Sequence, residues 1–177
     1  MSEIQSLITE QDNVELVRDQ VAAILRDELD NQIALAQSQS LSTAPWDVRV
    51  FIERAGAFEQ GLNNPSDTRP MLNVWIDNLN YDRSASQVVE RQRGVVFLNV
   101  DAIGYGVSSG NGLGHNASDQ QAAFSAQRAM RLARKILMAS SYVRLRMQGV
   151  VGTRMVQSIT YFQPTIDNAP VQSVYGA

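Results

Sequence analysis

The sequence predicts an α+β protein, with a mainly antiparallel sheet of about five strands and two helices packed on it. Two observations carry this prediction. Apolar residues recur with helical spacing in two long segments, and apolar and polar residues alternate in the segments between and after them. The 177-residue chain has no cysteine, yet it is long enough to bury a conventional core. We expect a single domain over residues 1–177, with its core at about 12–163 and an extended, flexible C-terminal arm at 164–177.

The first expected element is an amphipathic helix at 12–36. Asp12 and Glu15 have the spacing of a capping box, in which each residue satisfies a backbone group of the other. The apolar positions then keep near-helical spacing at Val14, Val17, Val21, Ile24, Leu25 and Leu29. The other side of this helix is acidic.

Three strands are expected next, at 47–54, 71–79 and 94–106, joined by hairpin-like connections. The second strand places Leu72, Val74 and Ile76 on the inward face. Its opposite face carries Asn73, Trp75 and Asp77. The polar, arginine-bearing stretch 80–93 is expected to be a long hairpin loop. A tryptophan on the polar face of a strand is either covered by a helix or offered to a partner.

A second helix is expected from Ser118, which forms a capping-box pattern with Gln121. Its apolar stripe is mainly alanine, at 122, 126, 129 and 133, and four cations occupy the remaining surface: Arg128, Arg131, Arg134 and Lys135. Alternation then predicts two further strands, at 141–147 and 150–162.

Charge is distributed unevenly along the chain. Residues 1–60 hold eleven acids and four bases, whereas residues 121–177 hold one acid and seven bases. Either both regions are solvated or paired within one subunit, or the acidic part of one copy meets the basic part of the next. Lys135 is the one lysine among fifteen basic residues. Arginine is enriched at protein interfaces, although a GC-rich genome produces the same bias.

The stretch GNGLG at 110–114 is the strongest candidate for a small-molecule site. A dinucleotide fingerprint requires G-x-G-x-x-G, and a P-loop requires Gly-Lys-Ser/Thr, so neither motif is present. The sole histidine, His115, lies in the same loop, beside Ser108 and Ser109. Neither serine stands in a nucleophile-elbow sequence, so a flexible connection is the favoured interpretation.

Two other features are candidates for chemistry or binding. Asp77 and Asp101 lie on the less apolar face of neighbouring strands, where a carboxylate pair could serve acid/base or metal chemistry. The basic last third of the chain also contains Tyr142 and Tyr161. Arginines that neutralise phosphates and aromatic rings that stack on bases suggest nucleic-acid binding as an alternative. The pI of about 5.1 argues against it. We therefore expect no catalytic residues, no cofactor and no metal.

The order of elements resembles that of the tail terminator, or tail completion, proteins of contractile-tailed bacteriophages. The resemblance covers roughly residues 12–162 and lies in three stretches: PMLNVWIDNLNYDRSASQ at 70–87, RGVVFLNVDAIGYG at 93–106 and SDQQAAFSAQRAMRLARKILM at 118–138. It implies a non-enzymatic α+β subunit that forms a homohexameric ring. Such a ring caps the tail tube, stops its polymerisation and joins the tail to the head-side connector.

The resemblance implies the virion tail or neck as the location, after synthesis in the host cytoplasm. The implied partners are further copies of the chain, the tail tube protein, the sheath and the connector or neck proteins. No membrane is expected, and DNA at most passes through the ring. The candidate interface residues are Glu15, Asp19, Trp75, Arg83, Arg91, Arg93, Arg128, Arg131, Arg134, Arg144 and Arg146. The alternatives are another neck, connector or tail-tube-like assembly protein, or an enzyme that uses the loop 110–114.

Overall fold

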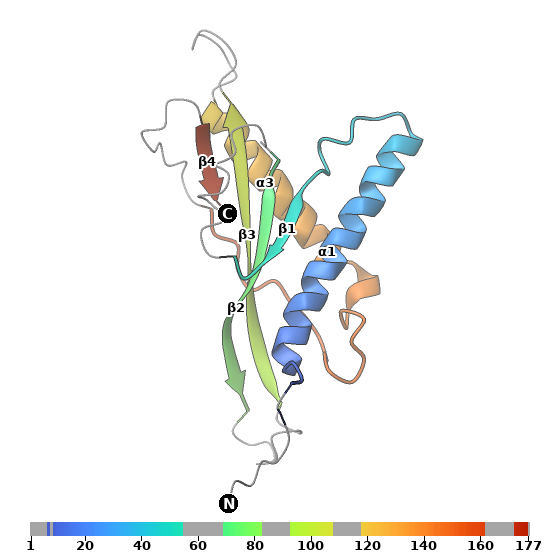
Figure 1. Ribbon diagram of the computed structural model, residues 1–177, viewed down its shortest axis with the longest axis vertical. Coiled ribbons are helices and arrows are strands. Elements are labelled where there is room, and N and C mark those ends of the chain that lie inside the picture. The colour runs from blue at the N-terminus through green and yellow to red at the C-terminus, as the bar shows by residue number, and fades with distance from the viewer. Residues whose placement is uncertain are drawn as a thin grey trace, which may run out of the picture.

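The computed structural model describes residues 7, 9–54, 69–82, 93–107, 118–161 and 172–176. The elements, in chain order, are α1 (Asn13–Ser38), β1 (Arg49–Ile52), β2 (Met71–Tyr81), β3 (Gly94–Val107), α3 (Ser118–Leu137), the short 3-10 helix η2 (Ser140–Tyr142) and β4 (Gln172–Gly176). The long strand β3 runs through most of the length of the molecule, and α1 lies obliquely beside it (Figure 1). This is the α+β architecture expected from the sequence.

The sheet is mixed, and two of its three strand pairs are antiparallel. β2 pairs antiparallel with β3, as predicted for a hairpin, and β4 pairs antiparallel with the far side of β3. β1, however, runs parallel to β2, with Arg49 opposite Met71 and Ile52 opposite Val74. The hairpin-like connection expected between these strands is therefore wrong. The segment 53–70 is long enough for the crossover that parallel pairing requires.

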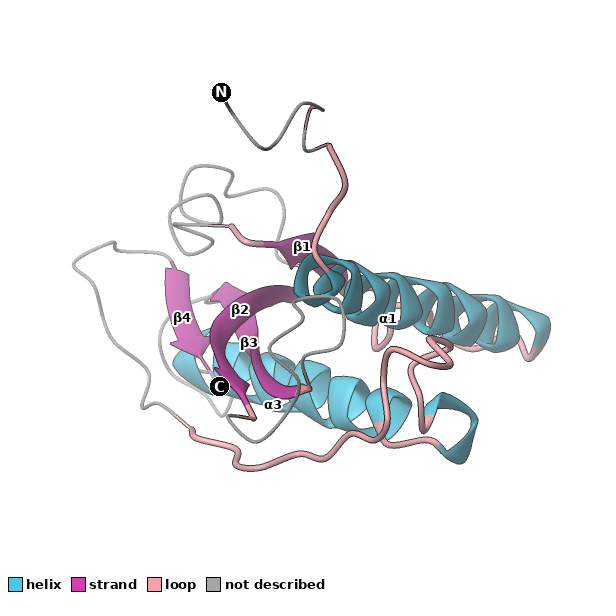
Figure 2. Ribbon diagram, turned by 90° about the horizontal axis from the view of Figure 1, so that it is seen from below, coloured by secondary structure: helices cyan, strands magenta, loops and turns pink. Residues whose placement is uncertain are grey.

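Strand alternation divides the sheet into two unlike faces. The first face carries Val50, Ile52, Leu72, Val74, Leu98, Val100 and Ala102, all of which belong to or pack against the main core cluster. Both helices contribute to this same core, α1 through residues such as Ile24 and Leu25 and α3 through Ala129 and Ala133. Figure 2 shows the two helices side by side. The inward placement predicted for Leu72 and Val74 is confirmed.

The alanine stripe lets α3 approach β3 closely. Ala122, Ala126 and Ala129 are fully buried. A Cβ atom added to Gly104 of β3 would lie 2.1 Å from the carbonyl oxygen of Ala122 and 2.5 Å from the amide nitrogen of Ala126. Small side chains on the helix and a glycine on the strand are therefore both needed for this contact.

The two strands predicted after α3 are wrong. Residues 140–146 form η2 and consecutive turns, and residues 151–161 have no regular secondary structure. Tyr142 and Leu145 are buried at a three-residue spacing, which the alternation of a strand does not produce, and Val143 is exposed. Leu145 and Arg146 adopt positive φ angles of 49° and 58°, which a strand does not accommodate. Within the arm expected at 164–177, residues 172–176 form β4, so this part is not a loose extension.

Candidate functional site

The outer side of α3 carries a row of cations. Arg128, Arg131, Arg134 and Lys135 are all exposed, and the helical period places them opposite the buried alanines. Within the part of the chain that the structure describes, none of these four side chains forms a hydrogen bond or an ion pair. The structure therefore brings three of the predicted interface arginines together on one helix face.

Two large apolar side chains flank this row. Phe124, one turn before Arg128, is 54% exposed, and Met138, directly after the helix, is 44% exposed. Exposed aromatic and methionine side chains beside arginine have the composition of protein interfaces. We define the basic face of α3 as Phe124, Arg128, Arg131, Arg134, Lys135 and Met138.

The two acidic candidates on α1 already have local partners. The backbone N–H of Asp12 donates to Oε2 of Glu15 at 2.9 Å, which confirms the predicted capping box. Asp19 forms an ion pair with Arg18 at 2.7 Å. The guanidinium of Arg18 also lies 3.3 Å from Glu53, at the end of β1. These contacts fix the first turns of α1 to the sheet, and Asp30 keeps an exposed carboxylate further along the helix.

A buried tyrosine joins α1 to the turn after η2. The hydroxyl of Tyr142, which is only 3% exposed, donates to Oε1 of Glu28. Arg146 donates to the same hydroxyl at 2.9 Å, and its guanidinium lies 5.0 Å from the centroid of the tyrosine ring. The hydrogen bond to Glu28, followed by burial, raises the pKa of Tyr142, while Arg146 opposes this rise. The tyrosine thus remains a neutral donor.

The remaining charge of Arg146 is shared with α1. Its guanidinium lies 3.5 Å from Oδ2 of Asp27, and both side chains are more than half exposed. One arginine of the basic C-terminal part therefore pairs with an acid of the N-terminal part within the same subunit. Such an exposed pair contributes at most about 1 kcal/mol.

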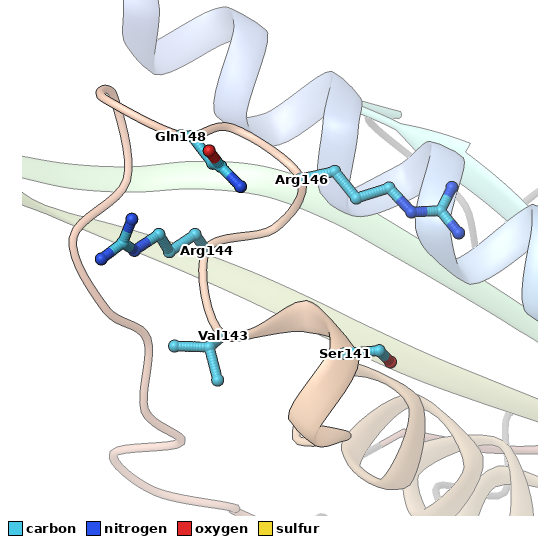
Figure 3. A pocket seen from close by; sticks show the side chains of 5 residues that line it. All are labelled: Ser141, Val143, Arg144, Arg146 and Gln148. Carbon is cyan, nitrogen blue, oxygen red and sulfur yellow. The ribbon is translucent and has the colours of Figure 1, made fainter.

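Arg144 and Arg146 do not form a joint anion site. They line an open depression with Ser141, Val143 and Gln148. Figure 3 shows Arg146 extending toward α1 while Arg144 points the other way. The side chain of Arg144 is exposed and forms no hydrogen bond or ion pair with the described residues. The strand that was predicted to present both arginines on one face is replaced by a turn that separates them.

The second face of the sheet carries Trp75. Its indole N–H donates to Oδ2 of Asp101 at 2.6 Å, and the ring is half-buried. Burial raises the pKa of the Asp101 carboxyl, and the hydrogen bond from Trp75 opposes that rise. Asp77 lies at the irregularity of β2, whereas Asp101 pairs with Asn73, roughly 13 Å away along the strand. The proposed carboxylate pair of Asp77 and Asp101 is therefore wrong.

The same face is polar and aromatic near β1. Asn73, which is buried, accepts from the backbone N–H of Arg54 at 3.1 Å and donates to its carbonyl at 3.2 Å. The guanidinium of Arg54 lies 4.5 Å from the ring centroid of Phe51. These contacts tie the end of β1 to β2 and make the side chain of Asn73 structural.

Sequence reasoning missed the role of Arg154. Its Nε donates to the carbonyl of Leu137, and one terminal nitrogen donates to the carbonyl of Ala139 at 2.5 Å. The last carbonyls of a helix have no partner within the helix, so this arginine caps α3. No local sequence signal identifies the pair, because Arg154 lies 17 residues after Leu137.

The remaining candidates lie in or near the connections that follow β2 and β3. Arg93 is exposed, and its carbonyl accepts from the N–H of Asp82 at 2.8 Å, where β2 and β3 enter their connection. Arg83 and Arg91 lie outside the described residues, as do the loop 110–114 and His115. No group of three or more acidic, histidine or cysteine side chains suited to a metal ion occurs in the described ranges.

Nor does a helix within those ranges have the length and apolar character needed to cross a bilayer. No family model, curated protein or solved structure matches the chain. The chemistry of its exposed surfaces is therefore the basis for assigning a function.

Proposed function

We propose that the chain is a structural subunit of a contractile bacteriophage tail, the tail terminator. In this role it forms a homohexameric ring on the end of the tail tube, stops tube polymerisation and joins the tail to the head-side connector. Its partners are other copies of itself, the tail tube protein, the sheath and the connector or neck proteins. It acts in the virion after synthesis in the host cytoplasm, and it catalyses no reaction.

The basic face of α3 is the observation that carries this proposal. It combines arginines that pair with none of the described residues with an exposed phenylalanine and an exposed methionine on a closely packed helix. Aromatic, methionine and arginine side chains are the residues most enriched at protein interfaces. A rigid element that displays them is suited to holding a neighbouring protein in a fixed orientation.

The long β2–β3 ribbon supports an assembly role in a second way. Past the irregularity between Ile76 and Asn78, the two strands remain paired to Tyr81 and Gly94. Figure 1 shows this part extending beyond β1 and α3. Tyr81 and Val95 are about half exposed there. A two-stranded ribbon is marginally stable by itself, so a neighbouring subunit that covers it would stabilise it.

A tube-capping assay tests the proposal. The chain is added to tail tube protein of the same phage during polymerisation, and tube lengths and ends are examined by electron microscopy. A terminator shortens the tubes in a dose-dependent way and decorates one end only. Tubes of unchanged length with bare ends would exclude the terminator role.

The same experiment separates the nearest alternative. Another neck or connector protein would bind the head-side connector while leaving tube length unchanged, and a tube-like protein would be incorporated along the whole tube. Affinity-gold labelling of the chain distinguishes end-binding from incorporation along the tube.

A further inference from the structure

Among the described residues, the basic face of α3 has no counter-charge. Its four cations form no ion pair or hydrogen bond with any described residue, although α1, which packs on the same core, is rich in acids. The buried sides of the two helices are turned to the common core. The basic face of α3 is therefore directed away from α1 of the same chain.

The solvent side of α1 carries the complementary charge. Helical spacing places Asp19, Asp27 and Asp30 together on that side, with Leu16, which is 39% exposed. Arg26 lies on this side as well, but its guanidinium donates to the carbonyl of Val50 at 3.1 Å. We call Leu16, Asp19, Asp27 and Asp30 the acidic face of α1. Asp19 and Asp27 also contact arginines of their own subunit, Arg18 and Arg146, whereas Asp30 forms no ion pair with the described residues.

We infer that the basic face of α3 docks on the acidic face of α1 in a second copy of this chain. The inference rests on the proposed function for its premise that the chain assembles with itself. The two surfaces are different, so the contact is heterologous: each subunit offers one face to its neighbour on one side and the other face on the other side. Contacts of this kind generate a ring when the rotation closes.

The dimensions and chemistry of the two faces agree. The cations span eight residues of α3, a rise of about 10 Å, and the carboxylates span twelve residues of α1, a rise of about 16 Å. Phe124 and Met138 on one side, and Leu16 on the other, provide apolar surface to bury beside the charges. Complementary charges accelerate encounter and fix the register of the contact.

Charge reversal on each face gives a sharp test. The basic-face variant is Arg131→Glu with Arg134→Glu, and the acidic-face variant is Asp27→Arg with Asp30→Arg. Each variant alone opposes like charges at every contact, so assembly should require at least about tenfold more protein at low salt. Mixed in equal amounts, the variants should recover rings in which they alternate. In such rings every contact again joins opposite charges.

Mass photometry gives the ring mass, and native mass spectrometry with one variant isotope-labelled gives the ratio of the two variants. Circular dichroism and thermal melting check that each variant is folded. The matched control is Arg131→Lys with Arg134→Lys, which keeps the charge and should assemble nearly as the native chain does. Added salt should reduce the difference between the native and variant chains in the protein concentration needed for assembly, because salt screens exposed charges.

Several outcomes would overturn the inference. These are a basic-face variant that assembles like the native chain at low salt, a mixture that stays monomeric, or a native chain that never self-associates. Loss of duplex DNA binding in the basic-face variant, with assembly unchanged, would assign the arginines to DNA instead. Rings that follow the predicted mixing rule but do not cap tubes would remove the terminator function and leave this contact standing. If both variants form rings as readily as the native chain and these rings cap tubes, the terminator function stands and this contact is removed.

Discussion

Gly104 of β3 lies directly beneath the backbone of α3 at Ala122, so that a Cβ atom there would come within 2.1 Å of the Ala122 carbonyl oxygen. Because the obstructing atom belongs to a helix backbone, the contact cannot be relieved by rotating a side chain. Gly104→Ala should lower the free energy of unfolding by about 3 kcal/mol, the upper range for overpacked cores. Urea denaturation followed by circular dichroism measures this loss in the free energy of unfolding.

The control for this substitution is Gly152→Ala, since a Cβ atom at Gly152 meets nothing within 4 Å. It should change stability by less than about 0.5 kcal/mol. Equal effects of the two substitutions would show that α3 does not lie on Gly104 as described.

The bond between Trp75 and Asp101 predicts a pH dependence with a defined sign. Burial raises the pKa of Asp101 in the folded state above its unfolded value, so ionisation of this carboxyl disfavours folding. The cost is absent below the unfolded pKa of about 4 and grows as pH rises through the folded pKa. Asp101→Asn keeps an oxygen that accepts from the indole but carries no charge. The variant should therefore gain stability relative to the native chain as pH rises from 3 to 7.

Parallel urea titrations of both proteins across that pH range measure the difference. The comparison variant is Asp77→Asn, an exposed acid on the neighbouring strand β2, which controls for the loss of one carboxylate charge. A relative advantage of Asp101→Asn that is greatest at acidic pH would contradict the assignment of burial as the dominant cause.

Removal of the Tyr142 hydroxyl should loosen the junction between α1 and the turn after η2. Tyr142→Phe removes the hydroxyl donor from Glu28 and one of the two acceptors of Arg146 while keeping the buried ring. The expected loss in the free energy of unfolding is about 1.5–3 kcal/mol, the range for hydrogen bonds to charged groups. Tyr161→Phe is the matched control because Tyr161 is 56% exposed, and a comparable loss there would contradict this account.

Arg154 should stabilise the end of α3. Arg154→Ala leaves the carbonyls of Leu137 and Ala139 without their charged donor and should cost about 2 kcal/mol. Hydrogen exchange should also accelerate in the last turn of α3 and in η2. Arg144→Ala, which removes an exposed arginine from the neighbouring turn, should change neither quantity. If Arg154→Ala is equally silent, the cap does not form in solution.

The sequence predicted most strongly those elements whose burial follows a simple period. The helix boundaries at α1 and α3 and the inward faces of β2 agree with the pattern because one side of each element packs on a common core. The segment 141–147 was misread because Tyr142 and Leu145 are the buried pair, while positive φ angles at Leu145 and Arg146 turn the chain. Non-glycine residues seldom adopt such angles, and their sequence does not reveal them.

Long-range polar contacts explain the remaining differences. Charge patterning correctly indicated exposed arginines on α3, but it could not show that Asp19 is paired with Arg18 or that Arg146 reaches Asp27. The parallel pairing of β1 depends on the path of the segment 53–70, which composition alone does not determine.

The mass of the assembled chain tests the central claim most directly. Mass photometry is carried out on the protein alone and with tail tube protein. A species of six 19.5-kDa chains should be present in at least the sample that contains tube ends. A chain that remains monomeric or dimeric under both conditions would contradict the account.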